Sequence, residues 1–185
     1  MLVVDWPVPN GIKIAFSQRH GGVSLPPYDS LNLGLHVGDD ANAVAANRQL
    51  VAQQLALPQV PYWLEQVHST KVVELGVDTD TIADGSFSRQ PHQVCVVMTA
   101  DCLPVLLTNK QGTQVAAVHA GWRGLCDGII EQAIAKFDCN ADQLIAYLGP
   151  CIGLKLLKLA QRSNKLLLIK IPKMNIVSSP ILISI

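Results

Sequence analysis

The chain has 185 residues, of which 49% are hydrophobic and 15% are charged, and its formal net charge at pH 7 is zero. This length is sufficient for one domain with a buried core, and the apolar composition excludes an intrinsically disordered chain. A balanced charge gives no overall attraction for nucleic acids or anionic lipids, so neither is an expected partner.

The first elements predicted along the chain are a strand and a helix. Residues 12–16 have the composition of a strand, and the segment after them is rich in glycine and proline, which is typical of loops. Helical spacing then places the apolar side chains of residues 43–55 on one face. Asp40 or Asn42 is expected to cap the N-terminus of this helix, and Pro58 closes it.

Apolar runs in the middle of the chain predict further strands. Two short candidates, residues 62–67 and 71–75, flank a loop that contains His68. Three more runs have the length and apolar character of strands in a buried sheet. These runs are residues 93–98, 104–108 and 114–118.

A helix over residues 128–137 and a strand over residues 144–148 complete the predicted elements. Together with the earlier elements they indicate a mixed α/β (α+β) domain. The five cysteines lack the paired spacing of a disulfide framework, which favours reduced thiols. No leader peptide is visible, and no apolar run has the roughly 18 residues that a membrane-spanning helix needs. We therefore expect a cytoplasmic protein.

The last segment of the chain differs from the rest in charge and pattern. Residues 1–142 contain all 14 acidic residues and 8 basic ones, whereas residues 143–185 contain 6 basic residues and no acidic one. From Leu154 onward neither a helical stripe nor strand alternation is sustained. Two interpretations stay open: an ordinary terminal segment packed on the domain, and a replaced or out-of-frame end.

Three side chains that can bind a metal ion each follow a strand candidate or end one: His68, Cys102 and His119. Imidazole and thiolate groups both suit Zn²⁺, and three protein ligands with a fourth position open are typical of a catalytic zinc site. Such a site activates water at neutral pH. The irregular spacing does not itself bring the three together, and each has a simpler interpretation as a residue of the core.

The same residues also permit a different chemistry. Cys102 can act as a thiolate nucleophile with His119 as its base and Asp101 or Asp84 as the orienting group, as in cysteine hydrolases. The two hypotheses compete for one sulfur atom. Arg123 follows a glycine-containing turn and can bind an anion, although a plain strand-to-helix turn explains that segment equally well.

Several sequence blocks occur in the order seen in the bacterial laccase-domain family, and the chain resembles that family over residues 1–153. The family is also called polyphenol oxidase, or purine nucleoside phosphorylase of the laccase-domain type. So many blocks in order are far more specific than any one motif. The blocks are residues 16–24, 31–40, 47–48, 66–68, 83–85, 99–104, 119–124 and 149–153.

The resemblance implies a four-layer α/β/β/α fold with mixed sheets, in which residues 1–153 form the metal-binding catalytic domain. It assigns His68, Cys102 and His119 as zinc ligands, with copper as the alternative metal. The activities it implies are phosphorolysis of adenosine, inosine, guanosine and methylthioadenosine, and deamination of adenosine, so a purine nucleoside and phosphate are the expected partners.

These reactions need different side chains. Phosphorolysis requires a cation that holds phosphate, for which Arg48 is the first candidate and Arg123 the second; Asn32 is also assigned to substrate binding. Deamination requires a group that moves protons, for which Asp101 and Asp84 are the candidates. Copper-dependent oxidation of phenols ranks last, because multicopper oxidation uses many histidines and the chain has five. A likeness of the fold to bacterial toxin deamidases keeps the cysteine hydrolase as an alternative.

Residues 154–185 depart from the family, whose members continue after Gly153 with about a further quarter of the domain. This divergent tail implies an incomplete C-terminal part and adds a third hypothesis, an inactive member of the family. An incomplete sheet is expected to expose apolar surface or a strand edge and to favour oligomerisation.

Overall fold

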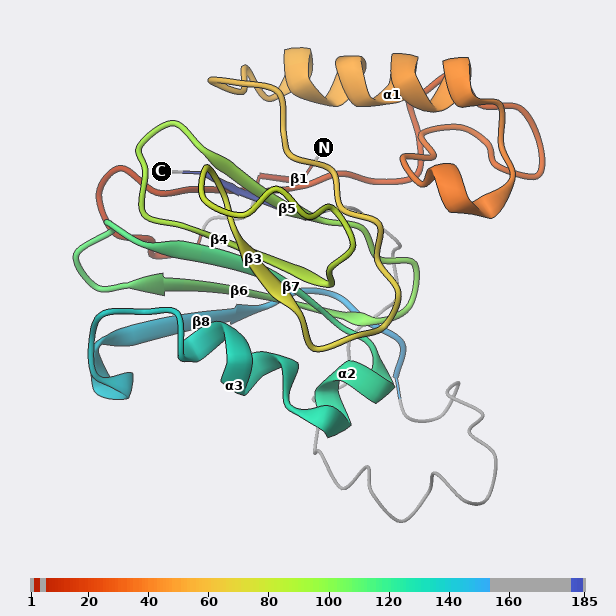
Figure 1. Ribbon diagram of the computed structural model, residues 1–185. Helices are drawn as coiled ribbons and strands as arrows, with labels where there is room; N and C mark the ends of the chain where they lie inside the picture. The colour runs from red at the N-terminus through yellow and green to blue at the C-terminus, as the bar shows by residue number, and fades with distance from the viewer. Residues whose placement is uncertain (1, 4–5, 154–180, 185) are drawn as a thin grey trace.

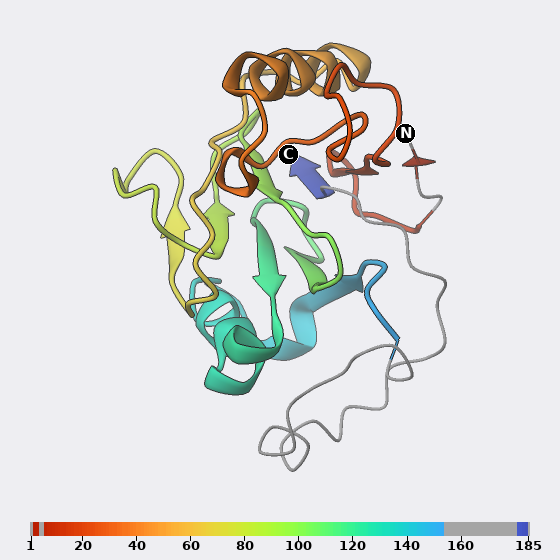
Figure 2. The same cartoon turned by 90° about the vertical axis from the view of Figure 1, so that its right-hand side faces the viewer.

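Four layers stack in the computed structural model, which describes residues 2–3, 6–153 and 181–184 (Figures 1 and 2). A long helix, α1, covers the outer face of a four-stranded sheet, and a five-stranded sheet packs against the inner face of that sheet. Two short helices, α2 and α3, cover the far side of the five-stranded sheet. This arrangement confirms the α/β/β/α fold that the family resemblance implied.

The four-stranded sheet is antiparallel throughout and has the strand order β1-β2-β9-β5. β9 comes from the C-terminal segment, lies between β2 and β5, and pairs with both. Apart from β9, the two interpretations of the tail, a packed terminal segment and a replaced end, concern residues 154–180, which lie outside the described residues. The strands are β1 (Leu2–Val3), β2 (Lys13–Phe16), β5 (Val94–Val97) and β9 (Ile181–Ser184).

The five-stranded sheet is mixed and has the strand order β3-β4-β7-β6-β8. Its mixed character comes from β3 and β4, which are parallel, while all its other neighbours are antiparallel. The strands are β3 (Val72–Glu74), β4 (Gly85–Ser88), β6 (Leu103–Asn109), β7 (Val115–Ala120) and β8 (Leu144–Leu148).

The predicted cap of the first helix is confirmed. Asp40 caps α1, because its carboxylate accepts hydrogen bonds from the backbone N–H groups of Asn42 and Ala43, both at 2.9 Å. None of the described helices has the length and apolar character needed to cross a membrane. The helices are α1 (Ala41–Gln54), α2 (Trp122–Asp127) and α3 (Ile129–Ile134), with 3₁₀ turns at Leu35–Val37 and Ala141–Gln143.

Side-chain alternation along the strands produces three separate cores. In β5, Val94 and Val96 pack into the core under α1, whereas Cys95 and Val97 belong to the core between the two sheets. β7 alternates in the same way between the inter-sheet core and the core beneath α3. Both faces of these strands are therefore buried, which explains why they are nearly continuous apolar runs.

The predicted strand over residues 62–67 is wrong. Its one ladder contact is an isolated parallel bridge between Glu65 and Ile82. Conversely, β4 was not predicted, because its sequence Gly-Ser-Phe-Ser has no β-branched residue, although all four residues are buried. Tertiary burial overrides local propensity in this strand.

The predicted single buried sheet and single second helix are also corrected. The runs over residues 93–98, 104–108 and 114–118 all form strands, but the first lies in the four-stranded sheet and the other two in the five-stranded sheet. The helix expected over residues 128–137 is the shorter α3, and α2 precedes it. Gly128, with a φ of 95°, separates the two helices.

Candidate metal centre

Two neighbouring strands of the five-stranded sheet position two of the three predicted ligands. Cys102 directly precedes β6, and His119 is the penultimate residue of β7. β6 and β7 are antiparallel, with Pro104 opposite His119 and Leu103 opposite Ala120. This register places the Cys102 thiol at the end of the sheet at which His119 lies.

The third predicted ligand, His68, comes from the loop that leads into β3. The ligand atoms of His68, Cys102 and His119 all lie within 4.8 Å of one another. The two imidazole rings meet edge to face, with centroids 4.8 Å apart and planes at 76°. A tetrahedral ion with bonds of about 2.0–2.3 Å separates its ligands by about 3.3–3.8 Å, so a small contraction closes the group around an ion.

Exposure differs among the three residues. The His119 side chain is buried, Cys102 is half-buried, and His68 is exposed. The group is therefore closed on the side of the sheet and open on the side of the His68 loop. Three ligands with one accessible side are the arrangement expected of a catalytic metal site rather than a structural one.

Gly121 leaves the space that this group requires. A Cβ atom at this position would lie 2.8 Å from His68 Cδ2, 3.3 Å from Cys102 Sγ and 3.5 Å from His119 Cε1. All three predicted ligands thus converge on a point that a side chain at Gly121 would fill. The donor set and this space together fit a single ion.

Asp84, immediately before β4, joins the two histidine-bearing segments. Its carboxylate is fully buried and contacts His119 Nδ1 at 2.9 Å. Burial alone would raise the pKa of Asp84, but hydrogen bonds from His119, Ser69 and His68 outweigh burial and lower the pKa to about 2. Asp84 is therefore a carboxylate at neutral pH.

The surroundings of Cys102 bear on the cysteine-hydrolase alternative. Burial, with added contributions from Asp101 and Asp84, raises the pKa of the Cys102 thiol to about 11. Cysteine nucleophiles instead have a lowered pKa in electropositive surroundings. A metal ion would deprotonate the thiol directly, so these surroundings favour Cys102 as a metal ligand over Cys102 as a free nucleophile. Asp101 itself is exposed.

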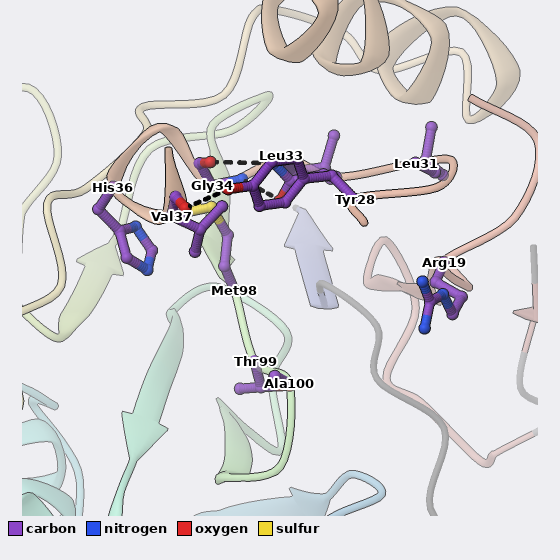
Figure 3. A pocket seen from close by; sticks show the side chains of 11 residues that line it. Arg19, Tyr28, Leu31, Leu33, Gly34, His36, Val37, Met98, Thr99 and Ala100 are labelled. Atoms are coloured by element: carbon purple, nitrogen blue, oxygen red, sulfur yellow. Dashed lines mark hydrogen bonds between the residues drawn. The ribbon is translucent and has the colours of Figure 1, made fainter. Parts of the chain in front are cut away.

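A pocket of about 380 Å³ lies between the N-terminal loops and the segment that follows β5 (Figure 3). Asn32 belongs to its loop side, where its side chain exchanges hydrogen bonds with the backbone of Gly34 at 3.1 Å. Residues 98–100 form the opposite side and continue directly into Asp101 and Cys102. The pocket wall and one predicted metal ligand are thus parts of one short segment.

Gln66 ties this wall to the His68 loop. Its side-chain amide donates to the Met98 carbonyl and accepts from the Met98 N–H, both at 2.8 Å. No role was predicted from sequence for Gln66, or for Tyr28 and His36 in the pocket. Their membership of the family blocks 66–68 and 31–40 was the signal available for Gln66 and His36.

The arginines predicted to bind substrate have other contacts. Arg48 donates from Nε and Nη2 to the Leu33 carbonyl at 3.0 and 2.8 Å, and its guanidinium lies 4.3 Å from the ring centroid of Trp63. It is not among the residues that line the pocket. Arg123 is exposed at the start of α2, beside the ring of Trp122. Their roles in substrate binding stay predictions.

Sequence comparison relates the chain to proteins named for nucleoside cleavage. The purine nucleoside phosphorylase YfiH of Shigella flexneri is 51% identical over 155 residues, which cover 83% of this chain and 64% of that protein. A purine nucleoside phosphorylase of Haemophilus influenzae is 51% identical over 152 residues, covering 82% of this chain and 62% of that protein. The chain thus spans just under two thirds of the length of these curated relatives.

Solved structures with the same fold include two bacterial proteins. A Neisseria meningitidis protein is 45% identical, with a TM-score of 0.81, and the match covers 89% of this chain and 68% of that one. YlmD from Geobacillus stearothermophilus is 28% identical, with a TM-score of 0.76 over 83% of this chain and 63% of that one.

A sequence model of one family matches residues 13–178, past residue 153, where the resemblance in individual blocks ends. The match covers most of the chain, and it agrees with both the relatives and the structural neighbours. The chain belongs to the family described as multi-copper polyphenol oxidoreductase laccase.

Proposed function

We propose that this chain cleaves purine nucleosides with phosphate at a zinc centre formed by His68, Cys102 and His119. The observation that carries the proposal is that the three ligand atoms lie within 4.8 Å of one another. One side of this group, at His68, is exposed. The names of the relatives, purine nucleoside phosphorylases, supply the reaction class. A bound zinc ion would supply Lewis acidity at this point.

Other residues of the chain are candidates for binding the nucleoside and the phosphate. The pocket has the size of sites that hold small organic molecules, and Asn32 and Tyr28 offer it polar and aromatic surface. In phosphorolysis a phosphate oxygen attacks C1′ of the ribose, the C1′–N9 bond breaks, and the base leaves with a proton. Arg48 is our first candidate for holding phosphate and Arg123 our second, because guanidinium groups bind phosphate oxygens in pairs.

Adenosine deamination is a second candidate reaction for the same centre. Water replaces the 6-amino group of the purine, and a carboxylate must move a proton from the water to the leaving amine. Asp101 favours this candidate, since it is exposed and adjoins the ligand Cys102. Asp84 suits proton transfer less, because it is fully buried and its oxygens already accept several hydrogen bonds.

A single cluster of candidate ligands favours one metal ion over a multicopper centre. Two imidazoles and a thiolate bind zinc or copper. The group of His68, Cys102 and His119 is the one cluster of candidate metal ligands within the described part of the chain, whereas multicopper oxidation requires several copper ions. The high pKa of Cys102 likewise disfavours a metal-independent cysteine hydrolase.

A single product analysis tests the proposal. Zinc-loaded protein is incubated with adenosine, with and without phosphate, and the products are separated by chromatography. Phosphorolysis yields adenine and ribose 1-phosphate only when phosphate is present. Inosine formed equally in both reactions would support deamination instead. Neither product, from protein that binds zinc, would contradict the proposal and support the hypothesis of an inactive family member.

A further inference from the structure

We propose that Asp84 is the positioning residue that assembles the metal centre, by holding the His68 loop and the His119 ring together before an ion binds. This inference rests on the metal centre proposed above. It gives Asp84 a different role from proton transfer, since the carboxylate acts through the two ligands and does not touch substrate.

The hydrogen bonds of Asp84 reach both ligand-bearing segments. Oδ1 accepts from the backbone N–H of His68 at 2.9 Å and contacts His119 Nδ1 at 2.9 Å. Oδ2 accepts from the backbone N–H groups of Val67 and Ser69 at 3.1 and 2.6 Å, and from the Ser69 hydroxyl at 2.8 Å. One carboxylate therefore accepts hydrogen bonds from three successive backbone N–H groups and also contacts one imidazole nitrogen.

These bonds determine which nitrogen of His119 faces the ion. A backbone N–H group can only donate, so the Asp84 oxygen that it reaches acts as an acceptor. The hydrogen bond between the same oxygen and His119 Nδ1 therefore requires a hydrogen on Nδ1. The lone pair of His119 then lies on Nε2, toward Cys102 and His68. A carboxylate that orients a ligating imidazole in this way also increases the basicity of the ligand.

The His68 loop needs the same carboxylate for a second reason. His68 has a φ of 61°, in the left-handed region that costs free energy for a residue with a side chain. Successive amides in such a loop point to one side and form a concave site for an anion. The Asp84 carboxylate fills this site, so it stabilises the backbone conformation that presents the His68 ring to the centre.

Asp84→Asn tests the role by changing one oxygen into an amino group. Both carboxylate oxygens face N–H donors, so either orientation of the new amide directs its hydrogens at other N–H groups. We expect zinc and cobalt affinity to fall about 10- to 100-fold, the usual cost of losing such a partner. The cobalt absorption spectrum should also change, since it reports ligand geometry.

Asn47→Ala is the matched control, because Asn47 is also fully buried and hydrogen-bonded but contacts the N-terminal loops. It should lower thermal stability and leave metal affinity within about twofold of the wild type. Equal metal affinity and cobalt spectra for Asp84→Asn and the wild type would overturn the inference. A wild-type chain that binds no metal would instead contradict the proposed function.

The tautomer of His119 in the metal-free wild type decides the matter even if Asp84→Asn does not fold. Long-range ¹H–¹⁵N spectra distinguish a protonated Nδ1 from a protonated Nε2. The inference requires hydrogen on Nδ1 and a free Nε2. A ring protonated on Nε2 alone would overturn it.

Discussion

Gly121→Ala would fill the space at the proposed metal centre without straining the backbone. Gly121 has a φ of −60° and a ψ of 158°, which alanine adopts without strain. The added Cβ would lie 2.8 Å from His68 Cδ2, whereas ordinary contacts begin at 3.4 Å, so the ring must move by about 0.6 Å. Metal–ligand distances tolerate deviations of only about 0.2 Å.

We therefore expect Gly121→Ala to weaken zinc binding about 10- to 100-fold, or about 1.4–2.8 kcal/mol. Competition with a chromophoric chelator measures the affinity, and thermal unfolding of the metal-free chain measures any loss of fold. Gly153→Ala is the control, because a Cβ there meets nothing within 4 Å. Zinc affinity equal to that of the control would refute the convergence of the three ligands on this point.

Two further substitutions test the core and the candidate phosphate site. Phe87→Ala removes a fully buried ring that packs edge to face on Phe137, and it should lower the free energy of unfolding by about 3–5 kcal/mol in urea titrations; a loss below about 1 kcal/mol would contradict the packing beneath α3. Arg48→Ala should raise the KM for phosphate while zinc content stays unchanged. If phosphate-dependent turnover and zinc content fell equally, Arg48 would have a structural role through its contacts with Leu33 and Trp63.

Elements with strong local signals were predictable from sequence. β8 forms over the predicted residues 144–148, and Asp40 caps α1, because a short apolar run that ends at Gly-Pro and a capping carboxylate are both local signals. β4 and the division of the strands between two sheets were not predictable. They depend on burial by distant segments, including β9, which joins β2 to β5 from the far end of the chain.

The site was predictable only through the family resemblance. Long, irregular spacing separates His68, Cys102 and His119, and only the register of β6 and β7 and the loop around Asp84 bring them together. Local pattern alone favoured a buried thiol and two core histidines over metal ligands. The contacts of Asp84 with both histidine segments depend on tertiary structure, so the positioning role that we propose for it could not be inferred from sequence.

A single metal centre that contains Cys102 requires one bound ion per chain, so metal content per chain is the decisive measurement. Elemental analysis after zinc loading and gel filtration should find one zinc ion per wild-type chain. Cys126→Ala, which alters an exposed cysteine, should retain that ion, whereas Cys102→Ala should lose it. Equal zinc content in the wild type and Cys102→Ala, with both folded, would show that Cys102 does not bind the ion.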